Sequence, residues 1–260
     1  MSPTPVLLHG FTGSPRSWDA VMRVLPGQAC IAPALLGHGA PANEVVTFMD
    51  EVDRLARLLP HEPVHLCGYS LGARLALGLL VRHGERISGA TLIGVNPGLS
   101  DPAAREQRLR HDAELARRLE TAGIDAFVRE WESQPLFATQ AHLPGAVRAR
   151  KRAERTSHDP HALARSLRVL GLGSMPDFWP ALPRLGCPIT LVAGARDDKF
   201  RELAVCALRV LPAARLRIVA DAGHDLLVER PEEIAVLLRE DLAAPGRHAT
   251  APNECRAAAG

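Results

Sequence analysis

A serine between two glycines is the residue in this chain most suited to chemistry. Gly68, Ser70 and Gly72 form a G-x-S-x-G motif directly after the apolar run of residues 63–67, and a helical pattern of leucines follows. The serine is therefore expected in a sharp turn between a strand and a helix. In such a turn a Cβ on either neighbouring position would collide with the backbone, which explains the glycines. This context predicts an exposed, activated hydroxyl.

An acid and an imidazole follow predicted strands further along the chain. Asp197 comes just after the apolar run of residues 188–192, and His224 follows the strand-like run of residues 216–220. An imidazole that takes the serine proton activates the hydroxyl, and a carboxylate fixes the tautomer of that imidazole. Alone, each would be interpreted as a surface loop residue. In the order Ser, Asp, His they predict a catalytic triad of the kind found in α/β-hydrolases, with Ser70 as its hydroxyl.

Backbone N–H groups that can hold a negative oxygen are expected near the N-terminus. Residues 5–8 have the pattern of a buried strand, and His9, Gly10 and Phe11 follow it. In α/β-hydrolases, this loop and the residue after the serine each supply one N–H. Phe11 and Leu71 are therefore predicted to form the oxyanion hole. His9 is interpreted as a residue that orients the loop rather than one that transfers a proton.

Strands and helices alternate along the chain, the pattern of a parallel sheet with helices on both faces. Strands are predicted near residues 5–8, 29–32, 63–67, 89–94, 188–193 and 215–219. Helices are predicted near residues 17–25, 45–59, 71–83, 200–210 and 231–243. A region without a convincing strand interrupts this alternation, and its helical runs lie near residues 102–120, 123–132, 143–155 and 159–170. Inserted between two strands, these helices would cover the ends of the strands where ligands bind.

The predicted fold class is therefore α/β: an α/β-hydrolase fold with a mostly parallel sheet flanked by helices and a helical cap inserted between sheet strands. The core is predicted to comprise residues 1–97 and 184–243, and the cap residues 98–183. Residues 244–260 are rich in Ala and Pro without periodicity, and are predicted to be a disordered tail. The antiparallel strands that usually open this fold are expected to be missing or reduced.

Composition narrows the class of protein. The 260 residues are 47% hydrophobic and 23% charged, and the net charge of +2 gives no argument for nucleic acid or membrane partners. No apolar stretch reaches the roughly 18 residues of a transmembrane helix, and no signal peptide pattern is present. The five cysteines lack C-x-x-C spacing, which is typical of reduced thiols. We expect a cytoplasmic monomer or weak homo-oligomer with a small-molecule substrate and no metal.

Arginine is concentrated in the predicted cap, where most arginines are interpreted as a solvated helix face paired with glutamates. Arg74 differs because it lies four residues after Ser70, on the same face of the predicted helix. Its guanidinium is predicted to reach the floor of the pocket. Since arginine binds carboxylates bidentately, this position favours a carboxylate-bearing substrate over an ordinary lipid ester.

Longer motifs make the chain resemble one known family, the MenH family. They are Gly68–Arg74 (GYSLGAR), Asn96–Leu99 (NPGL), Trp131–Phe137 (WESQPLF), Leu170–Gly173 with Pro176 and Trp179, and Gly194–Phe200 (GARDDKF). Members are 2-succinyl-6-hydroxy-2,4-cyclohexadiene-1-carboxylate synthases of menaquinone biosynthesis. The resemblance runs from His9 to about Pro231, and Ala73 stands where the family usually has glycine.

The resemblance implies a lyase that uses no metal or organic cofactor. Members eliminate pyruvate from 2-succinyl-5-enolpyruvyl-6-hydroxy-3-cyclohexene-1-carboxylate, with the triad serine acting as a base activated by the histidine. By the same resemblance, the residues that bind this polycarboxylate are Tyr69, Arg74, Arg108, Trp131, Phe137 and Arg155. Arg152 stays an alternative to Arg155, because it fits a gapless count from Trp131.

Two other functions stay open at this point. A serine hydrolase of a small carboxylate-bearing ester, thioester or C–C bond would use the same three residues. A ligand-binding protein without catalysis, built on the same fold, would not require the D-x-K-F motif that ends at Phe200.

Overall fold

The protein is described by a computed structural model that covers residues 2–25, 27 and 29–243. Its centre is a five-stranded sheet in which every strand pairs in parallel with the next strand along the chain. The strands are β1 (Thr4–Leu8), β2 (Val64–Tyr69), β3 (Ile87–Ile93), β4 (Ile189–Gly194) and β5 (Ala214–Val219). Because parallel strands end at the same edge of a sheet, the loops that follow them lie together.

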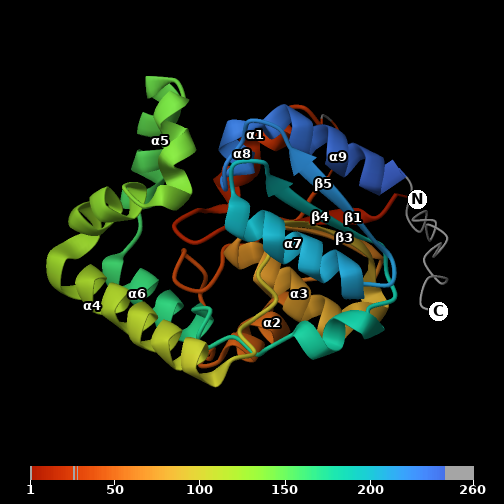
Figure 1. The fold of residues 1–260 in the computed structure, drawn as a ribbon, viewed down its shortest axis with the longest axis horizontal. Coiled ribbons are helices and arrows are strands. Elements are labelled where there is room, and N and C mark those ends of the chain that lie inside the picture. Colours follow the sequence, from red (N-terminus) through yellow and green to blue (C-terminus); the bar gives the residue numbers. More distant parts are fainter. Residues whose placement is uncertain (1, 26, 28, 244–260) are drawn as a thin grey trace, which may run out of the picture.

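Helices cover both faces of the sheet (Figure 1). One face packs against α2 (Phe48–Ala56), α3 (Leu71–His83) and α7 (Asp198–Val210). The other packs against α1 (Asp19–Met22), α8 (Leu226–Glu229) and α9 (Pro231–Ala243). Side chains alternate between these two apolar layers along each strand, since Leu191 belongs to the first and Val192 to the second. The α/β fold class predicted above is confirmed.

Five helical elements lie between β3 and β4, the last of them the 3-10 helix η4 (Trp179–Arg184). We call residues 98–183 the cap segment, and four of the five elements lie wholly within it. They are α4 (Pro102–Glu132), the 3-10 helix η3 (Pro135–His142), α5 (Gly145–Thr156) and α6 (Pro160–Leu170). These helices extend to one side of the sheet and its flanking helices (Figure 1). Leu115, Leu119, Phe127 and Leu163 give the segment an apolar core of its own. Gly123 interrupts α4 with a φ of 76°, which is why the sequence pattern there reads as two helices.

Two predicted elements differ from the structure. The strand near 29–32 is reduced to a single bridge between Ile31 and Val6, because Pro33 lacks the N–H that would continue the ladder. The helix near 17–25 is replaced by a 3-10 turn, Pro15–Trp18, followed by the four-residue α1. The predicted tail, residues 244–260, lies outside the described residues. Among residues 2–25, 27 and 29–243, none of the helices combines the length and the apolar character of a membrane span.

Candidate active site

Ser70 lies at the turn between β2 and α3 in a backbone conformation that non-glycine residues rarely adopt. Its φ is 53° and its ψ is −107°, and its N–H donates to the carbonyl of Ile93 at 2.8 Å. A Cβ on Gly68 would lie 2.5 Å from the Gly72 carbonyl oxygen, and a Cβ on Gly72 would lie 2.1 Å from the Leu8 carbonyl oxygen. The G-x-S-x-G spacing is therefore a steric requirement of the turn, whose strain costs roughly 1–3 kcal/mol.

The three predicted triad side chains meet in the structure. The Ser70 hydroxyl lies 3.0 Å from His224 Nε2, and His224 Nδ1 lies 2.7 Å from Asp197 Oδ2. Both partners are buried, with 3% of His224 and 7% of Asp197 exposed. With Nδ1–H donating to the carboxylate, Nε2 is free to accept the serine proton. The arrangement can make the hydroxyl basic or nucleophilic.

The imidazole and the carboxylate are held by their surroundings. Asp197 ends the loop after β4 and caps α7, where its side chain accepts from the Phe200 N–H. The Phe200 ring packs on the His224 ring with 4.3 Å between centroids, and the Tyr69 ring lies 5.4 Å away. These contacts restrict rotation of the imidazole. Phe200 belongs to the D-x-K-F motif, but its contact with the histidine could not be read from spacing.

The loop of residues 9–13 is fixed by a buried histidine. We call it the oxyanion loop after the role predicted for it from the sequence. His9 Nδ1–H donates to the Gly10 carbonyl at 2.8 Å, and its Nε2 accepts from the Leu35 N–H at 3.4 Å. Burial lowers the pKa of His9 from 6.5 to about 4, so the ring is neutral near pH 7. With both nitrogens occupied by backbone groups, His9 orients the loop, in agreement with the interpretation made from sequence. Leu71 begins α3, where a backbone N–H has no acceptor within its helix.

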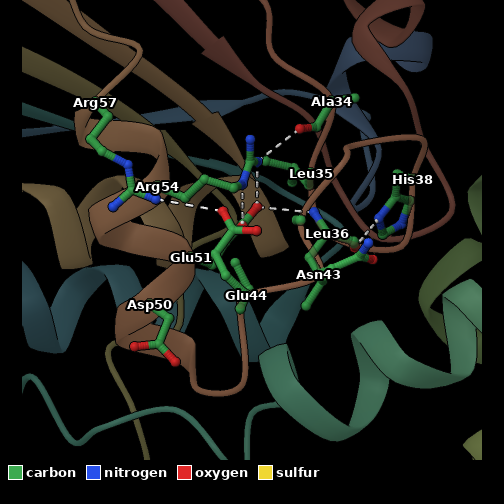
Figure 2. A network of polar contacts seen from close by, with 12 residues as sticks. Ala34, Leu35, Leu36, His38, Asn43, Glu44, Asp50, Glu51, Arg54 and Arg57 are labelled. Carbon is green, nitrogen blue, oxygen red and sulfur yellow. Dashed lines mark hydrogen bonds and ion pairs between the residues drawn. The ribbon is translucent and has the colours of Figure 1, made fainter.

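A second layer of polar contacts supports the oxyanion loop, and Figure 2 draws the part of it around residues 34–38. His38 Nε2 accepts from the Thr12 N–H at 3.1 Å, and His38 itself sits in the loop of residues 34–38. Glu51 of α2 accepts from the Leu36 N–H at 2.9 Å and pairs with Arg54 at 2.7 Å. Arg54 in turn donates to the carbonyl of residue 34 at 3.0 Å. The fully buried carboxylate of Glu51 thus anchors the loop of residues 34–38, which in turn contacts the oxyanion loop through His38.

A cavity of about 380 Å³ opens beside Ser70, between the carboxyl ends of the strands and the cap segment. All but one of the predicted site residues line it: Phe11, Tyr69, Ser70, Leu71, Arg74, Arg108, Trp131, Phe137, Arg155 and His224. Asp197 does not line it, because it lies behind the imidazole. Rings of the cap segment complete one wall, where Trp131 packs 5.2 Å from the Phe11 ring and 5.9 Å from the Phe137 ring.

The guanidinium of Arg74 reaches this cavity without an ion-pair partner among the described residues. Its Nη1 donates to the Leu170 carbonyl at 2.8 Å, and no carboxylate of the described residues pairs with it. Burial and the neighbouring Arg108 lower its pKa to about 9, which leaves it charged at neutral pH. Arg108 is paired with Asp112 at 2.8 Å. Arg74 is therefore available to an anionic ligand.

The structure separates the two arginines that sequence spacing left open. Arg155 is 2% exposed, lines the cavity and places its guanidinium 5.0 Å from the centre of the Phe137 ring. Arg152 pairs with the same carboxylate, Glu132, but 44% of its side chain is exposed and it does not line the cavity. The geometry favours Arg155.

Other lining residues were missed by the sequence analysis. They include Asn96, His111, Gln134, Lys151, Lys199 and Asp225. For Lys151, a signal was present in its position four residues before Arg155, on the same face of α5. Buried polar atoms without a hydrogen-bond partner among the described residues also mark the cavity wall: Trp131 Nε1, Arg155 Nε, Ser166 Oγ and Asp225 Oδ1. Such atoms are uncommon in native proteins and mark positions where a ligand can bond.

Comparisons with known proteins agree with this geometry. The model of the alpha/beta hydrolase family matches residues 6–237. A Bacillus subtilis (strain 168) protein, provisionally named a 2-succinyl-6-hydroxy-2,4-cyclohexadiene-1-carboxylate synthase, is 36% identical over 248 residues, 93% of this chain and 90% of that protein. The protein of that name from Serratia proteamaculans (strain 568) is 35% identical over 252 residues, 94% of each chain.

Among solved structures, MenH from S. aureus superposes with a TM-score of 0.89 at 31% identity, covering 93% of both chains. A thermophilic esterase from Thermogutta terrifontis superposes with a TM-score of 0.79 at 27% identity, covering 94% of this chain and 91% of that one. The resemblance inferred from the motifs is thereby confirmed. The chain belongs to the alpha/beta hydrolase family and, within it, to the family of 2-succinyl-6-hydroxy-2,4-cyclohexadiene-1-carboxylate synthases.

Proposed function

We propose that this protein is a carbon–oxygen lyase that eliminates pyruvate from 2-succinyl-5-enolpyruvyl-6-hydroxy-3-cyclohexene-1-carboxylate, leaving 2-succinyl-6-hydroxy-2,4-cyclohexadiene-1-carboxylate. The observation that carries the proposal is a hydrogen-bonded Ser70–His224–Asp197 relay that opens into a cavity with unpaired positive charge. Membership of the synthase family supports the same activity. The reaction belongs to menaquinone biosynthesis.

The relay supplies the base of the proposed reaction. As Ser70 Oγ removes a proton from the substrate ring, its own proton passes to His224 Nε2, and Asp197 stabilises the imidazolium. The electron pair released at the ring forms the new C=C bond and expels the enolpyruvyl oxygen, so a C–O bond breaks and the enolate of pyruvate leaves. The proton held by the imidazolium balances the one that this enolate takes up to become pyruvate, and the relay returns to its starting state. No covalent bond to the serine forms in this scheme.

The oxyanion hole has a matching role. We assign the N–H groups of Phe11 and Leu71 to an oxygen of the substrate on which negative charge develops during proton removal. Both residues line the cavity beside Ser70. Because the oxyanion loop is anchored through His9, the Phe11 donor is oriented before the substrate arrives, and the Leu71 donor is fixed by the start of α3.

The positive and aromatic side chains are proposed to bind the substrate. Arg74, Arg108 and Arg155 provide cations for carboxylates, which arginine binds with two parallel hydrogen bonds. Burial raises the pKa of Tyr69 well above its ordinary value, so its phenol stays protonated and can donate. Trp131 and Phe137 supply apolar surface for the ring. We further propose that residues 98–183 act as a cap on a core of residues 1–97 and 184–243.

The cellular setting is part of the proposal. We place the enzyme in the cytoplasm, a setting that keeps thiols reduced, since Cys30, Cys67, Cys187 and Cys206 are free thiols among the described residues. We also propose that it is a monomer or weak homo-oligomer.

A coupled assay tests the activity. The enolpyruvyl substrate is generated enzymatically and pyruvate release is followed with lactate dehydrogenase. Likeness to an esterase structure keeps a serine hydrolase as the second candidate. It is separated from the lyase by p-nitrophenyl acetate, which a lyase hydrolyses feebly and an esterase rapidly. Brisk ester hydrolysis without pyruvate release would refute the proposed lyase.

A further inference from the structure

Lys151 is a buried cation at the boundary between the cap segment and the triad. It lies on α5, is 8% exposed and lines the cavity. Its Nζ is 3.5 Å from Asp225 Oδ2 and 3.3 Å from Glu154 Oε2. Of the ion pairs formed by described residues, Lys151–Asp225 alone joins residues 98–183 to the rest of the chain. The arginines at 152 and 155 pair within the cap segment.

The first partner of Lys151 is a carboxylate in an unfavourable place. Asp225 follows His224 directly, is 1% exposed and lines a cavity that is otherwise suited to anions. Its Oδ2 accepts from Gln140 Nε2 at 3.4 Å, whereas its Oδ1 has no hydrogen-bond partner among the described residues. A buried carboxylate with incomplete hydrogen bonding depends on its cation. Without the ammonium, its charge would repel an anionic substrate.

The second partner connects Lys151 to the opposite side of the site. Glu154 Oε1 accepts hydrogen bonds from the hydroxyls of Ser14 and Ser17, at 2.6 Å and 2.8 Å. Ser14 comes directly after the oxyanion loop in the chain, and Ser17 lies three residues further on. One ammonium therefore braces the loop that carries His224 and, through Glu154, the segment that follows the oxyanion loop.

We propose that Lys151 is a positioning residue of this active site. It screens the Asp225 carboxylate from the substrate. It also holds the loop of His224 and, through Glu154, the segment that follows the oxyanion loop against the cap segment. This inference rests on the proposed function, because it takes the substrate to be a polyanion. Its partners are the protein's own carboxylates, which distinguishes it from the unpaired Arg74.

Four variants test the proposal: Lys151→Met, Asp225→Asn, the double variant, and Arg150→Met, an exposed position on the same helix, as the matched control. Lys151→Met is expected to raise the KM for the enolpyruvyl substrate about tenfold, with a smaller loss of kcat, because Asp225 then faces the anion unscreened. Asp225→Asn alone should not raise KM. In the double variant KM should return most of the way to the wild-type value, and the control should match wild type.

Several results would overturn the proposal. A double variant with the same KM as Lys151→Met would show that the ammonium contacts the substrate itself rather than screening Asp225. If Lys151→Met has the same KM and kcat as the control, Lys151 has no positioning role in the active site. If Lys151→Met does not fold, Asp225→Asn decides, since a tenfold rise in its KM contradicts screening.

Melting temperatures of the same proteins test whether the Lys151–Asp225 ion pair stabilises the fold, independently of any activity assay. We expect the two single substitutions to be strongly non-additive, because either one removes the same ion pair. If the melting-temperature shifts of the two single variants add up in the double variant, the Lys151–Asp225 ion pair does not hold the two segments together. A wild-type enzyme that releases no pyruvate would refute the proposed function, and the melting temperatures would still decide whether this ion pair holds the cap segment.

Discussion

Replacing Arg74 with Met removes the unpaired cation from the cavity floor and keeps much of its apolar volume. The guanidinium forms no ion pair with a carboxylate of the described residues, so the substitution breaks no ion pair among them. A charge-assisted hydrogen bond to a substrate carboxylate contributes about 1.5–3 kcal/mol. At about 1.4 kcal/mol for each factor of ten, kcat/KM for pyruvate release should fall about 10- to 150-fold.

Three controls make the Arg74→Met result interpretable. Arg74→Lys keeps the charge but loses the planar fork, so it should restore only part of kcat/KM. Hydrolysis of the neutral ester p-nitrophenyl acetate should not change, because that ester carries no carboxylate. The Leu170 carbonyl loses its donor, which costs roughly 1–3 kcal/mol of stability, so the assay is run well below the melting temperature. A kcat/KM within about twofold of wild type would refute the reasoning.

Three further predictions concern the residues that support the site. Asp197→Asn removes the carboxylate 2.7 Å from His224 Nδ1, so kcat for pyruvate release should fall about 10²- to 10⁴-fold at unchanged melting temperature, and a loss below tenfold contradicts the relay. Glu51→Gln leaves the buried Arg54 without its partner, so urea denaturation should show a loss of about 3–5 kcal/mol, whereas an unchanged midpoint would speak against the anchor. The depressed pKa of His9, about 4 against 6.5, means that the unfolded chain binds a proton more readily, so its contribution to stability is complete above pH 6.5 and is lost as the pH falls toward 4, by roughly 3 kcal/mol. Urea titrations of wild type and His9→Gln across that pH range check this last prediction. The free energy of unfolding of wild type should fall relative to that of His9→Gln as the pH is lowered, and a relative rise would contradict the prediction.

The fold and the meeting of the three triad side chains could be predicted from sequence because each side chain follows a short apolar run. Ser70, Asp197 and His224 come after β2, β4 and β5, and parallel strands bring the ends of such runs to one edge. The helices of the cap segment could also be predicted, because their apolar residues recur with helical periodicity. Even the interruption at Gly123, where φ is positive, left a visible break in the pattern.

What could not be predicted depends on contacts between distant parts of the chain. Spacing alone could not separate Arg152 from Arg155, because the choice depends on which side of α5 faces the cavity. The ion pair of Lys151 with Asp225 joins two segments far apart in sequence, and no local pattern signals it. At Ile31 the apolar run suggested a strand, but the proline two residues later limits the pairing to one bridge.

The central claim is that an imidazole-activated hydroxyl starts the loss of pyruvate. The most direct measurement compares the initial rate of pyruvate release from the enolpyruvyl substrate between wild type and Ser70→Ala. Because general base catalysis contributes about 10²- to 10⁴-fold, the variant should be slower by that factor at an unchanged melting temperature. Equal rates for the two proteins would contradict the claim.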